Sequence, residues 1–323
     1  MTYDALLILS FGGPNAHEDV MPFLENVTRG RKIPHERLLE VAEHYHHFGG
    51  KSPINEQNLA LVAALRQQLA ERGHQLPVYW GNRNWHPFLL DTLNEMKQDG
   101  VKKAVAFFTS AFSSYSGCRQ YHEDISKARA QVGAGAPQID KLGRFYLRPG
   151  FLQPMADGLA RAVSELSPHN PTVLFTAHSI PNSMASSCAY EEQLQQACQL
   201  CHQLSQVGAP WELVYQSRSG PPQQPWLEPD VCDRMRQLHQ QGCRAVVLVP
   251  IGFISDHLEV LYDLDTEAAQ LAEELGMAMR RVATVGVDAR FVSMIVDLIE
   301  ERCAQGENFI SCAPDCCPAP VRG

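Results

Sequence analysis

Six short apolar runs, each about the length of one buried strand, recur along the chain. Most are separated by segments whose apolar residues repeat at helical spacing. The runs are nearly continuously apolar, which is typical of strands that carry helices on both faces of a parallel sheet. They are Ala5–Phe11, Pro77–Trp80, Lys103–Thr109, Thr172–Ala177, Trp211–Gln216 and Arg244–Ile251. This alternation predicts an α/β chain with parallel sheets.

The segments between and after these runs predict seven helices. Gly100, Gly242, Gly276 and Gly306 stand where four of them should stop, as expected for residues that end helices in the left-handed conformation. The predicted helices are Asn55–Arg72, Pro87–Gln98, Phe151–Leu166, Glu191–Leu204, Glu228–Gln241, Glu259–Leu275 and Ala289–Gln305.

Chain length and an internal similarity predict two domains. The chain has 323 residues, more than the roughly 100–200 of a usual domain, and Gln131–Leu152 near its middle contains Gly, Ala and Pro clusters. The strand end at Leu9–Pro14 is similar in form to the strand end at Thr176–Pro181. We therefore predict two α/β domains, residues 1–149 and 150–306, and a cysteine-rich tail, residues 307–323.

Composition and charge exclude some classes of partner. Lys and Arg number 27 against 36 Asp and Glu, a net charge of −9 without a basic stripe, so nucleic acid is not expected as a partner. The apolar stretch Ala5–Leu9 is too short for a signal-peptide core, and the longest run, Ala245–Ile254, is far shorter than the ~20 residues of a membrane span. We expect a cytoplasmic protein with at most peripheral membrane contact.

Common nucleotide-binding and hydrolase motifs are missing. Gly12, Gly13 and Pro14 follow the first run, but the dinucleotide spacing G-x-G-x-x-G fails and Pro14 lacks the amide that would face a phosphate. The sequence also contains no P-loop, no G-x-S-x-G and no H-E-x-x-H motif.

Two strand ends carry side chains that can bind a metal. His178 directly follows an apolar run, although such a histidine, taken alone, is more often structural. Asp256 and Glu259 follow the run Arg244–Ile251, where the chain turns toward a helix, and there they could instead cap that helix as a capping box. An imidazole facing a carboxylate suits a divalent first-row metal, and either group can take a proton. His178 and Glu259 therefore indicate metal delivery coupled to deprotonation.

Five segments, in order along most of the chain, resemble the signature segments of the ferrochelatase family. They are Phe23–Arg31, His47–Asn55, Phe175–Pro181, Gln216–Asp230 and Pro250–Asp265. The sequences SFGGP near the start and GNRNWHP at Gly81–Pro87 are most similar to the actinobacterial type, which metallates coproporphyrin III to coprohaem. The resemblance implies two Rossmann-like doubly wound domains with the porphyrin in a cleft between them.

The resemblance also implies roles for the metal-binding pair. His178 matches the histidine of the family's T-A-H-S motif and Glu259 the acid of its D-H-x-E motif, the pair taken to bind the Fe²⁺ substrate and handle protons. A neutral His178 would receive a proton while Glu259 offers negative charge to the cation. A cleft that holds the macrocycle bent would expose its nitrogen lone pairs to the metal.

Four further residues are expected to contact the porphyrin. Ser52 and Tyr121 match porphyrin-contacting positions of the coproporphyrin type, while Arg29 and Tyr45 could meet substrate carboxylates. Each has another interpretation: Ser52 could cap a turn, Tyr121 could pack in the core, and the other two could be surface residues.

Two observations bear on which porphyrin is the substrate and on how its iron is ligated. Many Gram-positive relatives have a tyrosine at the position of Phe11 that can ligate the product iron, so here Tyr121 would be the first candidate for that role. No apolar insert resembling the membrane-facing lip of eukaryotic enzymes lies between Phe23 and Pro53. Its absence favours coproporphyrin, whose four propionates need a wetter cleft.

The cysteines of the tail suggest a resident metal group. Cys312, Cys316 and Cys317 lie in a short Pro-rich segment where burial cannot explain thiols. Several ferrochelatases carry a [2Fe–2S] cluster on such an extension, and the resemblance makes Cys118 the fourth ligand, with Cys303 its main rival. Zinc or unligated thiols are the alternatives.

Three functions remain open at this stage. The first is an enzyme, a lyase that inserts Fe²⁺ into coproporphyrin III in haem b biosynthesis and could pass its product to a downstream haem-pathway enzyme. The second is a protoporphyrin IX ferrochelatase that makes protohaem directly. The third is a haem or iron–sulfur sensor without turnover on the same fold. Presence of both His178 and Glu259 favours catalysis.

Overall fold

The computed structural model describes residues 2–30, 33–220, 223–305 and 316–319. As far as it is described, the chain divides into two compact units. Unit 1 comprises Met1–Thr109, Gln120–Gly143 and Val292–Ser311, and unit 2 comprises Ser110–Arg119, Arg144–Phe291 and Cys312–Gly323.

Unit 1 is built on a four-stranded parallel sheet with the order β2-β1-β3-β4. Its strands are β1 (Ala5–Ser10), β2 (Val78–Asn82), β3 (Lys103–Phe108) and β4 (Gln138–Lys141). Its helices are α1 (Val20–Val27), α2 (His35–His47), α3 (Ile54–Glu71), α4 (Leu89–Gln98), α5 (Gln120–Val132) and most of α12 (Ala289–Gln305).

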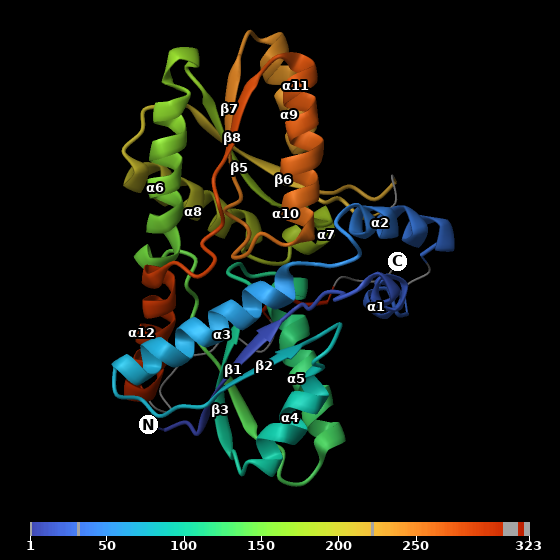
Figure 1. Ribbon diagram of the computed structural model, residues 1–323, viewed down its shortest axis with the longest axis vertical. Coiled ribbons are helices and arrows are strands. Elements are labelled where there is room, and N and C mark those ends of the chain that lie inside the picture. Colours follow the sequence, from blue (N-terminus) through green and yellow to red (C-terminus); the bar gives the residue numbers. More distant parts are fainter. Residues whose placement is uncertain (1, 31–32, 221–222, 306–315, 320–323) are drawn as a thin grey trace. The chain divides into compact units, whose positions relative to one another are not determined.

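Strand β1 explains why this sheet needs helices on both faces. All six of its residues are buried, and successive side chains of a strand point to opposite faces. Leu7 and Leu9 join a core cluster with Leu93 of α4 and Ile125 of α5, while α3 contacts β1 and β2 from the other side (Figure 1).

Unit 2 repeats the same strand order, β6-β5-β7-β8, again with every pair parallel. Its strands are β5 (Thr172–His178), β6 (Trp211–Gln216), β7 (Ala245–Val249) and β8 (Ala278–Arg281). Its helices are α6 (Pro149–Glu165), α7 (Asn182–Ala185), α8 (Tyr190–Ser205), α9 (Val231–Gln240), α10 (Leu258–Tyr262) and α11 (Ala269–Leu275).

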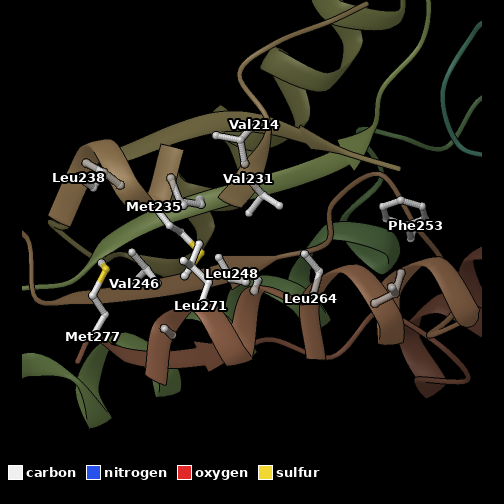
Figure 2. Packing of buried hydrophobic residues seen from close by; sticks show 14 residues of the cluster. Val214, Val231, Met235, Leu238, Val246, Leu248, Phe253, Leu264, Leu271 and Met277 are labelled. Carbon is white, nitrogen blue, oxygen red and sulfur yellow. The ribbon is translucent and has the colours of Figure 1, made fainter. Parts of the chain in front are cut away.

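Helices cover both faces of this sheet as well. Figure 1 shows α6 and α8 on one side of the sheet and α9 and α11 on the other. Figure 2 shows the second of these cores, in which Val246 and Leu248 of β7 pack with Met235 of α9 and Leu271 of α11. The prediction of parallel α/β sheets is therefore confirmed.

The secondary-structure elements that were not predicted from the sequence are mainly short or polar. All six predicted strands are present, but the edge strands β4 and β8 were not predicted, because QIDK and AMRR have little apolar character. The predicted helix Glu259–Leu275 is divided into α10, a π-helical segment at Asp263–Ala268, and α11. Helices α1, α2, α5 and α7 were also not predicted.

The last helix, α12, is divided between the two units, whereas the predicted domains, residues 1–149 and 150–306, place all of it in the second domain. Phe291, near the start of α12, packs on Phe145 with ring centroids 6.0 Å apart and belongs to unit 2. From Val292 onwards the helix belongs to unit 1, where Asp297 accepts a hydrogen bond of 2.6 Å from Arg72. Helical periodicity indicates that a segment is a helix, but it does not indicate which unit the helix packs against.

Candidate active site

The carboxyl ends of β5 and β7 bring together the two side chains predicted to bind metal. His178 is the last residue of β5, and Glu259 lies in the first turn of α10, the helix that follows β7. These two strands are neighbours in the sheet although β6 lies between them in the chain. They flank the point where the strand order reverses, which is where ligands bind in doubly wound sheets.

The geometry of this pair suits a shared cation. Nε2 of His178 lies 3.7 Å from Oε1 of Glu259, which is too long for a hydrogen bond. Two ligands that each lie about 2.1 Å from one ion are separated by about 3.0–3.4 Å, so a small movement would let both bind it. Their side chains are 32% and 47% exposed, respectively, and are therefore accessible.

Each member of the pair holds the other in its charged form. Burial by itself would lower the pKa of His178, but the Glu259 carboxylate and the Ser179 carbonyl raise it to about 9. Burial would likewise raise the pKa of Glu259, yet the imidazolium lowers it to about 2. In the metal-free protein the nearby opposite charge outweighs desolvation and favours the protonated ring of His178, whereas a neutral ring is the form that binds a metal. Metal binding must displace the proton on Nε2.

The ring of His178 is oriented by the backbone. Its Nδ1 donates a hydrogen bond to the main-chain oxygen of Ser179, so Nε2 is the nitrogen that faces Glu259. Tyr190 donates from its hydroxyl to the main-chain oxygen of His178 at 2.9 Å. Such contacts fix the orientation of a ligand before the metal arrives.

The capping interpretation of this segment is wrong. The residue that caps α10 is His257, whose Nδ1 accepts a 3.2 Å hydrogen bond from the N–H of Glu259. Burial lowers the pKa of His257, in keeping with the neutral ring that this acceptor role requires. Asp256 instead accepts a 2.7 Å hydrogen bond from Arg281.

The π-helical segment after α10 adds an acid that the sequence analysis did not single out. Asp263 accepts hydrogen bonds from Ser217 and from Nε2 of Gln216, the latter at 3.3 Å. Burial, opposed by the Ser217 hydroxyl and assisted by the charge of Glu259, raises the pKa of Asp263 to about 7. Single π-helical turns are frequent at functional sites, but no sequence pattern marks where a helix widens.

The residues predicted to contact porphyrin lie in unit 1. Ser52 is buried, and its N–H donates a 3.0 Å hydrogen bond to Pro14. Tyr45 packs edge-on against Phe23, and Arg29 is exposed. The roles of these three residues in binding stay predictions.

Tyr121 has the surroundings of a core residue. Its ring stacks on Phe108 with centroids 4.8 Å apart, and the Arg83 guanidinium lies 4.4 Å from the ring centroid. Burial raises the pKa of Tyr121. Its contact with porphyrin, and its ligation of product iron in place of Phe11, remain predictions.

Three of the four cysteines predicted to hold a cluster are described. Cys118 is buried in a π-helical segment, Tyr115–Arg119, and belongs to unit 2 together with Cys316 and the buried Cys317. Cys312 lies outside the described residues. Cys303 is grouped with unit 1. Within the described part of the chain, no three His, Cys, Asp or Glu residues form a group able to hold a metal ion.

None of the helices in the described ranges is both long and apolar enough to cross a bilayer.

Comparisons with known sequences give matches along nearly the whole chain. The family model described as ferrochelatase matches residues 3–303. A ferrochelatase of Rhodopirellula baltica is 52% identical over 329 residues, covering 98% of this chain and 93% of the relative. A coproporphyrin III ferrochelatase of Streptomyces coelicolor is 50% identical over 351 residues, covering 98% of this chain and 94% of the relative.

A solved structure shares the fold. SirB from Bacillus subtilis with Fe³⁺ superposes with a TM-score of 0.55, covering 94% of this chain and 97% of that one, at 10% sequence identity. At so low an identity, this similarity concerns the arrangement of helices and strands alone.

Proposed function

The chain belongs to the ferrochelatase family, and we propose that it inserts ferrous iron into coproporphyrin III to form coprohaem in haem b biosynthesis. The relatives named coproporphyrin III ferrochelatases, about half identical over nearly the whole chain, support this substrate. The observation that carries the proposal is the pair of His178 and Glu259, 3.7 Å apart at the reversal point of the sheet.

The charges of the pair suggest how protons and iron are exchanged. Insertion replaces two pyrrole protons by one Fe²⁺. In the resting pair Glu259 is an anion and His178 carries one extra proton, which an arriving Fe²⁺ displaces to water. When the iron moves on to the macrocycle, the vacated His178 can accept one pyrrole proton. Asp263, with a pKa of about 7, is our candidate for accepting the second.

Unit 1 is proposed to recognise the porphyrin through Ser52, Tyr121, Arg29 and Tyr45. Arg29 is exposed, so its guanidinium is accessible to a propionate, which it can bind with two parallel hydrogen bonds. Coproporphyrin has four propionates and protoporphyrin two, so contacts of this kind would favour the first.

We also propose a [2Fe–2S] cluster on Cys118, Cys312, Cys316 and Cys317. Two observations support these ligands: the described tail cysteines share unit 2 with Cys118, whereas Cys303 does not, and Cys118 and Cys317 are both buried. The described thiols do not form a metal group on their own, and the fourth proposed ligand, Cys312, lies outside the described residues. Its function would be to fix the tail, since metal insertion transfers no electrons. Cys316→Ser should then yield a colourless and less stable protein, and a brown mutant of full stability would exclude this ligand set.

We further propose that the enzyme works in the cytoplasm and passes coprohaem to a downstream haem-pathway enzyme. The net charge of −9 supports an aqueous setting without nucleic acid.

The test compares two porphyrins under anaerobic conditions. The purified protein is mixed with Fe²⁺ and either coproporphyrin III or protoporphyrin IX, and the visible spectrum reports metalloporphyrin. We expect rapid formation of coprohaem and slow formation of protohaem. A higher kcat/KM for protoporphyrin IX than for coproporphyrin III would make protoporphyrin IX the substrate. Binding of either porphyrin without turnover would favour a haem or iron–sulfur sensor over an enzyme.

A further inference from the structure

Gln216 stands beside the metal-binding pair without belonging to it. It is the last residue of β6 and the register partner of His178 on β5. The residue is 1% exposed, so its amide is a polar group in the interior. A buried amide is retained at such a position only if its hydrogen bonds are useful.

The amide of Gln216 reaches from the strand end to the helix that carries Glu259. Its Nε2 donates to the main-chain oxygen of Glu259 at 3.1 Å and to the carboxylate of Asp263 at 3.3 Å. Both partners are acceptors, so only the NH₂ group can face them, and this fixes the orientation of the amide. Its Oε1 is buried and has no hydrogen-bond partner among the described residues, so the side-chain bonds that Gln216 makes to other residues come from its Nε2.

These bonds restrain Glu259 from both sides. The N–H of Glu259 donates to His257, and its carbonyl oxygen accepts from Gln216. Glu259 lies in the first turn of α10, which runs without a break into the π-helical segment Asp263–Ala268 and α11, and the first N–H groups of a helix have no partner within it. The bonds to His257 and Gln216 therefore tie the end of the helix that carries Glu259 to the neighbouring loop and to the end of β6.

We propose that Gln216 is a positioning residue for iron binding, which keeps Glu259 at ligand distance from His178. The inference rests on the proposed function, because it concerns how that site acquires its metal. It explains why the side chain next to His178 in the sheet bonds the main chain of Glu259. Ser217 donates separately to Asp263, so the bond to Glu259 can be tested apart from the acid of the π-helical segment.

Two substitutions of Gln216 distinguish the effect of its hydrogen-bond donors from the effect of its side-chain length. Gln216→Leu keeps a similar volume but removes the donors, and Gln216→Asn keeps the amide but shortens it by one methylene. Gln193→Leu is the matched control, because Gln193 is also buried in unit 2, at 2% exposure, but bonds Ser113 instead. Ser217→Ala removes the hydroxyl contact with Asp263 alone.

We expect both Gln216 variants to raise the KM for Fe²⁺ by about 10- to 100-fold, the range seen when partners of metal ligands are lost. The KM for coproporphyrin III should change by less than about 2-fold, because Gln216 acts on the metal ligands. Gln193→Leu should lower the Tm and leave the KM for Fe²⁺ unchanged. Ser217→Ala should leave that KM closer to wild type than either Gln216 variant does.

Binding of Co²⁺ without porphyrin, measured by calorimetry, gives a second result that does not depend on turnover. Co²⁺ should bind wild type and Gln193→Leu alike and the Gln216 variants about 10- to 100-fold more weakly. If wild type neither binds Co²⁺ nor inserts Fe²⁺, the proposed function fails. If wild type does both and a folded Gln216 variant matches it, Gln216 has only a structural role and this inference is overturned. Should Gln216→Leu not fold, Gln216→Asn decides the question.

Discussion

The two units share one strand order but differ at the carboxyl ends of their central strands. Unit 1 ends β1 at Ser10, whose hydroxyl accepts a 2.9 Å hydrogen bond from Asn58, and both side chains are buried. Unit 2 ends β5 at His178, which is paired with the Glu259 carboxylate and partly exposed. One strand end is thus neutral and closed, and the other is charged and accessible.

This difference shows what topology determines and what it leaves open. The order of strands sets the place at which a ligand can bind. In both sheets the chain adds one strand on one side of the first strand and the next two strands on the other side, and ligands bind where this order reverses. Side chains then decide the chemistry at that place. A neutral hydrogen-bonded pair can hold a loop in position, whereas an ion pair with free access can exchange a proton for a metal ion.

The largest effect is expected from exchanging the charged strand end for a neutral one. His178→Ala and Glu259→Gln should each lower iron insertion into coproporphyrin III by about 10²- to 10⁴-fold, because each removes a metal ligand and a proton carrier. Initial rates under anaerobic conditions measure this. Ser10→Ala, the matched change in unit 1, should lower stability by about 1–3 kcal/mol through the unpaired Asn58 and leave the KM for Fe²⁺ unaltered. Full activity of His178→Ala would contradict the assignment.

A smaller effect should separate the two units by substrate. A Cβ added at Gly252 would lie 2.7 Å from Ala177, the residue before His178, and one added at Gly13 would lie 2.6 Å from the Cβ of Ser52. Neither approach is sterically allowed, so the neighbouring backbone must shift. Gly252→Ala should raise the KM for Fe²⁺ by about 10-fold, and Gly13→Ala should raise the KM for coproporphyrin III by a similar factor.

Steady-state titration of each substrate in turn distinguishes these outcomes. If both variants changed the same KM, the two strand ends would not serve different substrates, and the contrast drawn above would have to be abandoned.

The sequence predicted the buried parts of the fold well. Strands such as Thr172–His178 are nearly continuously apolar up to Ala177 because helices cover both faces, and this pattern is visible without a structure. Strand β8, with the sequence AMRR, lies at an edge and is paired on one side only, so it needs no such pattern. The limits of the units could not be predicted either, because α12 contacts residues distant in sequence, such as Arg72.

The candidate site was predictable in part. His178 and Glu259 could be named because each follows an apolar strand and matches a family motif. Gln216 and Asp263 were not singled out, because their importance comes from contacts across the sheet and from a π-helical turn. The upward shift in the pKa of His178 could not be predicted either, since it depends on the distance to Glu259, which no spacing in the sequence provides.

The smallest effect concerns the pH dependence of stability, which should come from unit 2. The pKa of His178 is about 9 when folded, above its ordinary value of 6.5, so the pair's contribution is fully present below pH 6.5 and is lost as pH rises through 9. The pKa of Glu259 is about 2 against an ordinary 4.5, so its contribution is present above pH 4.5 and is lost as pH falls through 2. The stabilisation is therefore greatest between pH 4.5 and 6.5.

Thermal unfolding of wild type and Glu259→Gln measures this contribution. Because both side chains are partly exposed, solvent screening keeps the effect small, and we expect the difference in Tm to be about 2–4 °C at pH 6 and to shrink towards zero by pH 9.5. Glu165→Gln, which removes an exposed partner of Arg280 in the same unit, should show a pH-independent difference across this range, since no histidine takes part in that pair. A difference for Glu259→Gln that stayed constant from pH 6 to 9.5 would mean that His178 is neutral in the resting protein, and iron would then bind there without displacing a proton.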